Sequence, residues 1–343
     1  MKKTIVSLGV IAVLLFSLAA PFSAAAINLS SEIDAVLNYY SSRQTVIENW
    51  DEIVAFASVN AVKGSDLKEP ELDENEPVTL AQFIFSRLAL GIKPSDASSV
   101  GDPVALLASK QKDDGSFYEN DLFSDVLCAT ALEGARTAAG DDGTVYSAKQ
   151  AVRHILSAQN ENGAFAPDMK THAFCMTYLS AFTENNAEVT QALDKAAKYI
   201  AEEYKTAEAV GEASTEEVAY ATAALVDAGK AKTLEEFASY GDLPSVLVSR
   251  KNADGTYRAS SEEGEGVKSA AVAAITAYDA ISDGKSVWRS FTDYGGVNES
   301  MWEKLKWVAL GFGVLVLLSV IFWLYILFGR KKYRDDESGA VGQ

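Results

Sequence analysis

Gln-Lys-Asp-Asp-Gly-Ser-Phe, at residues 111–117, decides the fold of this chain because the same loop chemistry returns twice. Residues 159–165 read Gln-Asn-Glu-Asn-Gly-Ala-Phe, and residues 251–257 read Lys-Asn-Ala-Asp-Gly-Thr-Tyr. The offsets are 48 and 92 residues, and 92 is twice 46. A period of this size is typical of stacked or closed arrays of helical hairpins. The repeated positions are Gln111, Gly115, Phe117, Gln159, Gly163, Phe165, Lys251, Gly255 and Tyr257.

The hydrophobic pattern between residues 30 and 282 is helical nearly throughout. Val126, Ala129, Leu132 and Ala135, for example, recur at three-residue steps, which places them on one face of a helix. No stretch alternates convincingly with a period of two, as a half-buried strand would. We therefore predict an all-α fold.

Each copy of the loop stands between two predicted helices. The helix ahead of it ends in an apolar pair, namely Leu106-Leu107, Ile155-Leu156 or Val246-Leu247. The helix behind it is rich in small residues and spans Asp121–Ala139, Met169–Phe182 or Gly266–Ile281. Small side chains let helix backbones approach closely, so we expect the second helix of each pair on the inside and the more charged first helix on the outside.

Two further pairs of predicted helices lack the loop signature. One combines residues 198–205 with 215–228, and the other combines residues 48–62 with 79–90. Both fall one period from a recognisable copy. Terminal and degenerate units are common in repeat arrays, and the expected total is therefore about five hairpins.

Loops of the form Gln-x3-Gly-x-aromatic between paired helices resemble the QW-type repeats of the terpene cyclase and protein prenyltransferase superfamily. The resemblance covers about residues 45–282 and implies an α/α toroid. It also implies that Gln111 and Gln159 cap a neighbouring inner helix while Phe117 and Phe165 stack on it, as structural clamps. The chain departs from the family because Phe or Tyr replaces the Trp, and Lys251 replaces the third Gln.

The catalytic motifs of related toroids are missing from the sequence. Squalene-type cyclases protonate their substrate with an Asp-x-Asp-Asp motif, which this chain lacks. The acidic pairs at 113–114 and 141–142 fit turns and helix caps instead. The thioester motif Gly-Cys-Gly-Glu-Gln of complement-like toroids is also absent. No catalytic residue is therefore predicted.

Four residues on two predicted inner helices form the one candidate site. Cys128 and Cys175 align between the repeats, and Asp125 and His172 each lie three residues earlier, on the same helix face. By resemblance to the prenyltransferases, this set implies a zinc site. Two buried thiols without a function, or a disulfide between Cys128 and Cys175, remain open alternatives. His154 is expected on the exposed face of an outer helix.

Both ends of the chain carry membrane-targeting patterns. Residues 1–26 combine Lys2 and Lys3 with an apolar stretch and the small residues at 24–26, which predicts a cleaved signal peptide. Residues 307–328 are 22 residues without a charge, which suffices to span a bilayer. The basic segment 330–334 follows directly, so the C-terminus is expected in the cytoplasm.

The sequence thus predicts a single-pass type I protein of the cell membrane, and its simple ends look bacterial. The predicted parts are a signal peptide (1–26), an extracellular toroid domain (27–282), a juxtamembrane linker (283–306), a transmembrane helix (307–328) and a cytoplasmic tail (329–343). Without the leader and the tail, 24 basic and 45 acidic residues remain, a net charge of about −21. This charge argues against nucleic acid and anionic bilayer surfaces as partners. Only two cysteines exclude a small disulfide-stapled scaffold.

Three functions are compatible with these features. The favoured one is a non-catalytic extracellular module, anchored by its single C-terminal helix, that binds an unknown ligand or protein. The second is an enzyme of the prenyltransferase or terpene cyclase type with a zinc site. The third is a carbohydrate-active toroid, which requires a groove lined by exposed aromatic residues and two carboxylates about 5–10 Å apart. Acidic residues are too abundant here to discriminate among them.

Overall fold

The computed structural model describes residues 27–43, 47–62, 67–68, 70–94, 101–139, 146–262 and 264–294. Within these ranges the chain is helical and contains no β-strand, only two isolated bridges, Ile47–Leu67 and Lys251–Tyr257. The prediction of an all-α fold is confirmed.

The helices begin and end where local chemistry favours it. Side-chain oxygens of Asp102, Ser147 and Asp168 accept N–H groups from the first turns of α5, α7 and α8, which satisfies donors that a helix start leaves unpaired. The described helices are α2 (Leu29–Ser42), α3 (Trp50–Ser58), α4 (Pro77–Ala89), α5 (Pro103–Ala108), α6 (Leu122–Ala139), α7 (Ala148–Ser157), α8 (Met169–Ser180), α9 (Ala187–Glu203), α10 (Ala207–Glu212), α11 (Thr215–Asp227), the 3₁₀-helix η1 (Leu234–Tyr240), α12 (Leu243–Ser249), α13 (Lys268–Asp283) and α14 (Val287–Tyr294).

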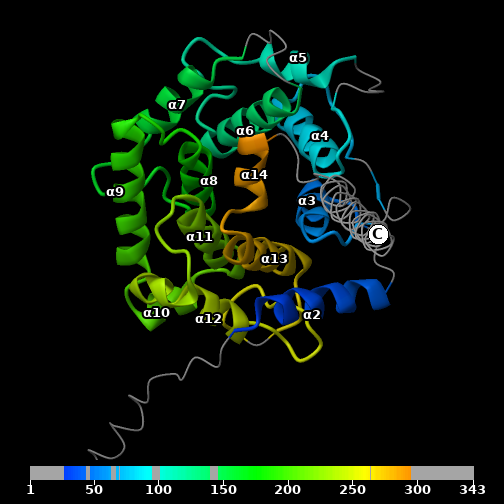
Figure 1. Ribbon diagram of the computed structural model, residues 1–343, viewed down its shortest axis with the longest axis vertical. Helices are drawn as coiled ribbons and strands as arrows, with labels where there is room; N and C mark the ends of the chain where they lie inside the picture. The colour runs from blue at the N-terminus through cyan, green and yellow to red at the C-terminus, as the bar shows by residue number, and fades with distance from the viewer. Residues whose placement is uncertain are drawn as a thin grey trace, which may run out of the picture.

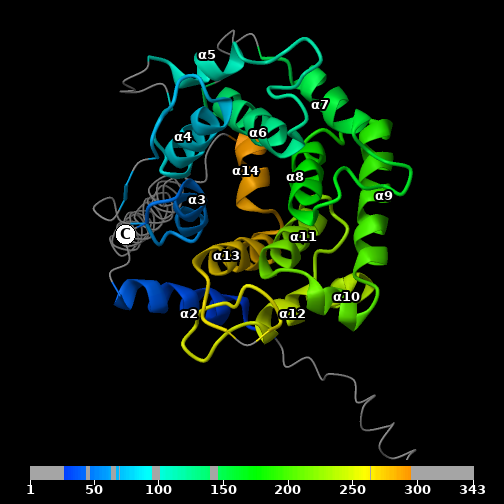
Figure 2. The same cartoon turned by 180° about the vertical axis from the view of Figure 1, so that it is seen from behind.

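Six helices form a closed circuit, which we call the inner ring. It consists of α3, α4, α6, α8, α11 and α13, and each packs against the next until α13 returns to α3 (Figures 1 and 2). The helices α2, α5, α7, α9 and α12 lie outside this circuit. Small residues make the ring possible, since α13 is buried without interruption over residues 270–281. A helix buried on all sides needs side chains that let several neighbours approach.

The inner ring differs from the expected hairpins in one respect. Residues 48–62 were expected as the outer partner of the next helix, but α3 occupies an inner position between α4 and α13. Every residue from Glu52 to Ala57 is buried. A run buried all round needs partners on all sides, and the outer position offers contacts on one side only.

The three repeated loops share one backbone conformation. In each, the residue after the Gln or Lys donates its N–H to a carbonyl four residues on, at 2.7–2.8 Å. The motif glycines have φ angles of 94°, 95° and 91°, a region that favours glycine. A Cβ at Gly115 would lie 2.3 Å from the carbonyl oxygen of Gln150 in α7. Glycine therefore lets each loop press its backbone against the next outer helix.

The third loop joins the two ends of the described chain. A Cβ at Gly255 would lie 2.6 Å from the carbonyl oxygen of Ala35 in α2. Lys251, which replaces the Gln of the other copies, forms an ion pair with Glu32 of α2. Tyr257 also donates its hydroxyl to Glu32, at 3.4 Å. We call this contact between the loop 251–257 and α2 the seam of the ring.

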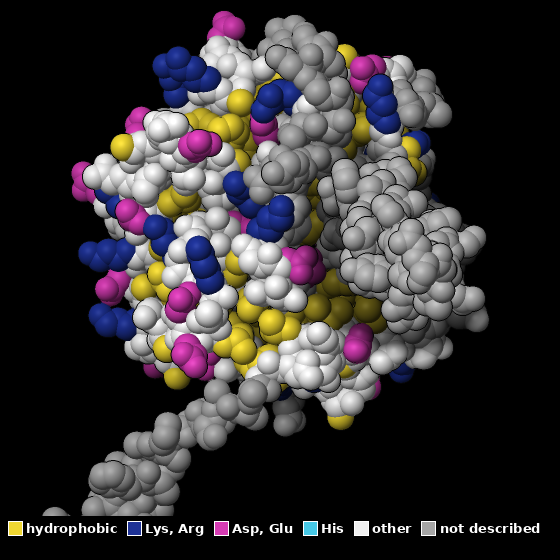
Figure 3. Space-filling model, viewed as in Figure 1, with side chains coloured by type: hydrophobic (Ala, Val, Ile, Leu, Met, Phe, Trp, Pro, Cys, Tyr) yellow, Lys and Arg dark blue, Asp and Glu magenta, His cyan; other side chains and the backbone are white. Residues whose placement is uncertain are grey.

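Part of the segment predicted as a linker belongs to the folded body. Helix α13 extends to Asp283, and residues 287–294 form α14, which crosses the inner ring from α13 towards α6 (Figure 1). Trp288 and Phe291 are 2% and 0% exposed. In the space-filling view of this face, hydrophobic side chains gather in the region of α13 and charged ones of both signs line much of the rim (Figure 3).

The predicted signal peptide, transmembrane helix and cytoplasmic tail lie outside the described residues, as does the end of the predicted linker. In the part of the chain that the structure describes, no helix has the length and apolar character needed to cross a membrane.

Candidate functional site

Asp125, a predicted zinc ligand, holds its own repeat loop. One oxygen of its carboxylate accepts the backbone N–H groups of Phe117 and Tyr118, at 2.7 and 2.8 Å. The other oxygen lies 2.9 Å from Nε2 of His154 in α7. His154 was expected to be solvated, but this bond brings it inward and leaves its side chain 23% exposed. The Asp125 carboxylate thus ties the loop and the outer helix to α6.

His172 performs the same task in the second repeat. Its Nδ1 accepts the N–H of Phe165 at 3.1 Å, so the ring proton sits on Nε2 and points to the carbonyl of Ala196, 3.2 Å away. Burial lowers the pKa of His172 to about 4. The imidazole is therefore neutral at physiological pH, and both of its nitrogens are bonded within the fold.

The two cysteines are free thiols, and both are buried. Burial raises the pKa of Cys128 and of Cys175 well above the ordinary value, which makes both thiols unreactive. Among the described residues, no group of three or more His, Cys, Asp or Glu side chains is placed to hold a metal ion. The predicted set does not fit a zinc site in this arrangement, because the donor atoms of Asp125 and His172 already hold loops.

The motif glutamines bond to outer helices, whereas the family resemblance implied inner ones. Gln111 accepts the N–H of Ser147 at 2.8 Å and donates to the carbonyl of the same residue at 3.2 Å. Gln159 donates to the carbonyl of Ala192 in α9 at 2.8 Å. Phe117 and Phe165 are both buried. These contacts join one repeat to the next.

Aromatic side chains fill the middle of the inner ring. Neighbouring ring centroids in this group lie 5.2–6.1 Å apart, a separation at which aromatic rings attract one another. Trp288 of α14 lies at the centre of the group, and its buried indole N–H has no hydrogen-bond partner among the described residues. We call the group the aromatic column, which comprises Trp50, Phe85, Phe123, Phe174, Tyr220, Trp288 and Phe291.

Charged side chains gather at one end of this column. Three of them, Asp51, Lys170 and Glu216, are the second residues of α3, α8 and α11. Nζ of Lys170 lies 3.7 Å from a carboxylate oxygen of Glu216 and 5.2 and 5.3 Å from the ring centroids of Phe123 and Tyr220. With Glu52 and Lys268, which pair at 2.7 Å, these residues form what we call the N-terminal mouth of the ring.

The charges of the mouth act on one another. Burial raises the pKa of Asp51, while the ammonium group of Lys170 acts in the opposite direction. Burial also raises the pKa of Tyr220, and the carboxylates of Asp51 and Glu216 add to that rise. This group was not predicted from the sequence. It could have been suspected from the charged residue that stands at the second position of three inner helices.

The start of α14 is fixed to the opposite ends of the inner helices. Asp227, the last residue of α11, accepts the N–H and the hydroxyl of Ser286, each at 2.7 Å. It also accepts the hydroxyl of Thr177 in α8 at 2.8 Å. The equivalent Thr130 in α6 instead donates to its own helix, at the carbonyl of Val126. In the second repeat, the hydroxyl of Thr177 therefore helps to fix α14 through Asp227.

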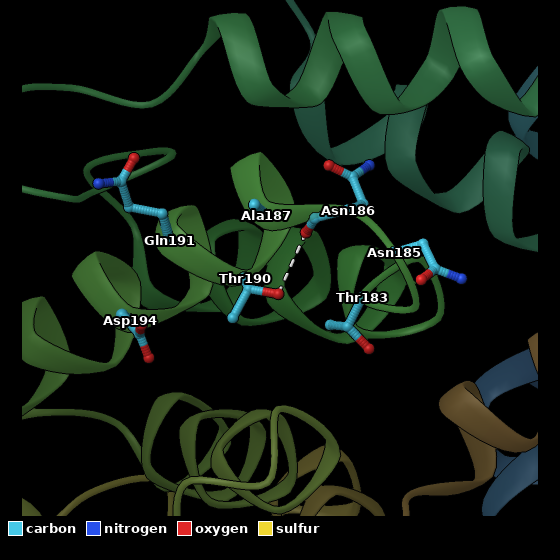
Figure 4. Close-up of a pocket in the computed structure, with 7 residues that line it drawn as sticks. All are labelled: Thr183, Asn185, Asn186, Ala187, Thr190, Gln191 and Asp194. Atoms are coloured by element: carbon cyan, nitrogen blue, oxygen red, sulfur yellow. Dashed lines mark hydrogen bonds between the residues drawn. The ribbon is translucent and has the colours of Figure 1, made fainter.

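A separate pocket of about 550 Å³ lies at the turn before α9. It is lined by amides and hydroxyls, including Asn185, Asn186 and Gln191. These side chains point away from one another, and the drawn hydrogen bond is local, from Thr190 to the carbonyl of Asn186 (Figure 4). Asp194, the carboxylate of this pocket, forms an ion pair with Lys230. The pocket has no convergent chemistry, so the mouth is the stronger candidate.

Comparison with known proteins returned no matching family model, curated protein or solved structure.

Proposed function

We propose that this chain is a membrane-anchored extracellular module with an α/α-toroid fold, which binds a ligand or a partner protein and does not catalyse a reaction. The observation that carries the proposal is the aromatic column. A reaction chamber inside the ring requires an open, concave centre with a few convergent polar groups. Here the centre holds packed side chains, two of them from α14.

The toroid part of the proposal rests on the closed circuit of inner helices, the outer helices around it and the three loops of equal conformation. The resemblance of those loops to QW-type repeats supports the same fold. The membrane part rests on the predicted signal peptide at 1–26 and the predicted span at 307–328.

Neither enzymatic alternative has a supporting observation among the described residues. The prenyltransferase-type alternative needs Asp125 and His172 as metal ligands, and both are bonded to repeat loops. The carbohydrate-active alternative needs exposed aromatic residues along a groove. In the aromatic column, Phe85, Phe174 and Tyr220 are 0%, 3% and 5% exposed.

Topology provides the first test. The full chain, with an epitope tag after residue 343, is expressed in a bacterial host, and intact cells are treated with protease. We expect the body to be digested while the tag survives, and the mature N-terminus to lie within residues 23–27. Protection of the body in intact cells, together with its digestion in lysed cells, would refute the extracellular placement.

Metal content and turnover provide the second test. The full chain purified in a non-ionic detergent should contain substoichiometric zinc and show no turnover of prenyl diphosphates or polysaccharides. One zinc per chain that is lost in both Cys128→Ser and Cys175→Ser variants would favour the prenyltransferase-type enzyme. Turnover of either substrate class would overturn the non-catalytic assignment.

A further inference from the structure

The N-terminal mouth holds an ammonium group on an aromatic floor. Nζ of Lys170 lies within 5.3 Å of the centroids of Phe123 and Tyr220. A cation within about 6 Å of an aromatic centroid is attracted by the electron-rich face of the ring. Two rings and the carboxylate of Glu216 therefore surround one cation, with Asp51 near enough for its pKa to respond to that charge.

The floor under this cation is held rigidly. The ring of Phe174 packs against Phe123, Tyr220 and Trp288, with centroids 5.2–5.4 Å apart. Phe174, Tyr220 and Trp288 are at most 5% exposed. A floor that does not need to reorganise loses little free energy on binding a ligand. The cation position is thus built before any ligand arrives.

The mouth carries more negative than positive groups. Its carboxylates are Asp51, Glu52 and Glu216, and its ammonium groups are Lys170 and Lys268. Lys268 forms its ion pair with Glu52. A partly buried carboxylate without a full counter-charge is costly, so an additional cation would stabilise this end of the ring.

Lys170 is a replaceable occupant of the site. Its side chain is 36% exposed, and a flexible four-carbon stem lets the ammonium group move into solvent. The floor and the two carboxylates belong to other helices, namely α3, α6 and α11. These groups stay in place when Lys170 withdraws.

We propose that the N-terminal mouth binds an organic ammonium ligand, whose cation takes the place of the Lys170 ammonium above Phe123 and Tyr220. Asp51 and Glu216 supply the counter-charge. The inference rests on the proposed binding function and names the ligand class. An anion is disfavoured, because it would have to draw Lys170 away from Glu216 and face the excess carboxylate. The net charge of −18 also attracts cations to the chain.

The experiment uses the full chain in a non-ionic detergent and titration calorimetry. Tetramethylammonium and n-butylammonium represent free amines, and Nα-acetyl-lysine amide represents a lysine of a partner protein. Removing the competing ammonium in Lys170→Ala should tighten binding of these probes about tenfold, which corresponds to about 1.4 kcal/mol. In that background, Asp51→Asn, Glu216→Gln and Phe123→Leu should each weaken binding severalfold. The order of affinities among the probes identifies the source of the ammonium group.

Lys205→Ala is the matched control, because Lys205 lies exposed just after the end of α9 and pairs with Glu202 at 3.2 Å. It removes the same charge and should leave binding unchanged. Equal or weaker binding in Lys170→Ala, or an equal gain in Lys205→Ala, would overturn the proposal. Circular dichroism establishes that each variant is folded. The topology and zinc tests do not involve the mouth, so a failure here removes the ligand class and leaves the module intact.

Discussion

Asp227 binds Ser286 across 59 residues of sequence, and it uses both carboxylate oxygens to do so, each at 2.7 Å. The two bonds fix the first turn of α14 to the end of α11. Since α14 brings Trp288 and Phe291 into the ring, this carboxylate controls whether the aromatic column is complete. Its protonation is therefore expected to affect the whole fold.

The Asp227 side chain should make stability depend on pH. Burial raises its pKa from 3.8 to about 6, so the folded state binds this proton more tightly than the unfolded state. The resulting stabilisation is complete below about pH 4 and is lost as the pH rises through about 6, an effect of about 3 kcal/mol. We expect Asp227→Asn to flatten this part of the profile, measured by urea unfolding between pH 4.5 and 8.

Asp279 in α13 provides an internal control for that measurement. Burial raises its pKa to about 6 as well, so Asp279→Asn should remove a separate part of the same slope. Asp113→Asn changes an exposed carboxylate in the first repeat loop and should leave this part of the profile unchanged. An Asp227→Asn profile with the wild-type slope would show that Asp227 does not titrate in this range.

The two histidines of the chain should titrate far apart. The hydrogen bond with Asp125 raises the pKa of His154 above 6.5, whereas burial lowers that of His172 to about 4. Proton NMR should show one imidazole titrating above 6.5 and another that stays neutral between pH 5 and 8. His154→Gln assigns the first signal.

The loss of stability in His154→Gln should become smaller as the pH rises. Because the folded pKa of His154 is raised, its contribution is complete below 6.5 and is lost as the pH rises through the folded value. Partial exposure limits the cost of His154→Gln to about 1 kcal/mol. A cost that grows with pH would contradict the Asp125–His154 pair.

Gly255→Ala should destabilise the ring more than Gly284→Ala. Both glycines have positive φ angles, 91° and 75°, so both substitutions strain the backbone. Only Gly255 adds a collision, since its Cβ would lie 2.6 Å from the Ala35 carbonyl, whereas no atom of the described residues lies within 4 Å of a Cβ at Gly284. We expect an additional loss of about 1–3 kcal/mol in urea unfolding. Equal losses would mean that the seam can shift freely.

Trp288→Ala should cost about 3–5 kcal/mol of unfolding free energy, as expected when a large aromatic side chain leaves a packed core. Ile92→Ala, at a side chain that is 38% exposed, should stay within about 0.5 kcal/mol of the wild type. Chemical denaturation compares the two variants. A small loss at Trp288 would indicate that α14 contributes little to the fold.

The thiols of Cys128 and Cys175 should react only on unfolding. Both thiols are buried and form no disulfide, and burial raises the pKa of each. Ellman's reagent should find no reactive thiol in the native chain and two per chain in denaturant without reductant. Reaction of none in denaturant would reveal a disulfide, and rapid native reaction would reveal an exposed site.

Local sequence signals predicted most of the inner ring. The predicted and observed bounds of α4, α6, α8, α11 and α13 agree within two residues at each end, because small-residue periodicity, caps and glycines act over short distances. The inner position of α3 and the burial of α14 were not predictable in this way. Both depend on contacts with helices that are far away in sequence.

The candidate sites were likewise predictable from the sequence only in part. Aligning the repeats correctly placed Asp125 and His172 at equivalent positions, but their role depends on loop N–H groups that the alignment does not show. The mouth was not predicted, because Asp51, Lys170 and Glu216 have the sequence pattern of ordinary solvated residues at helix starts. Only closure of the ring brings them together.

The seam has a consequence for how the protein is made. Helix α2 leaves the ribosome early, but the loop that covers it follows more than 200 residues later, since Lys251 meets Glu32 across 219 positions. Contacts of such separation are slow to form. During synthesis the first helix therefore waits without its partner, and the ring cannot finish folding until residue 257 has left the ribosome. The seam thus sets the moment at which folding of the body can end.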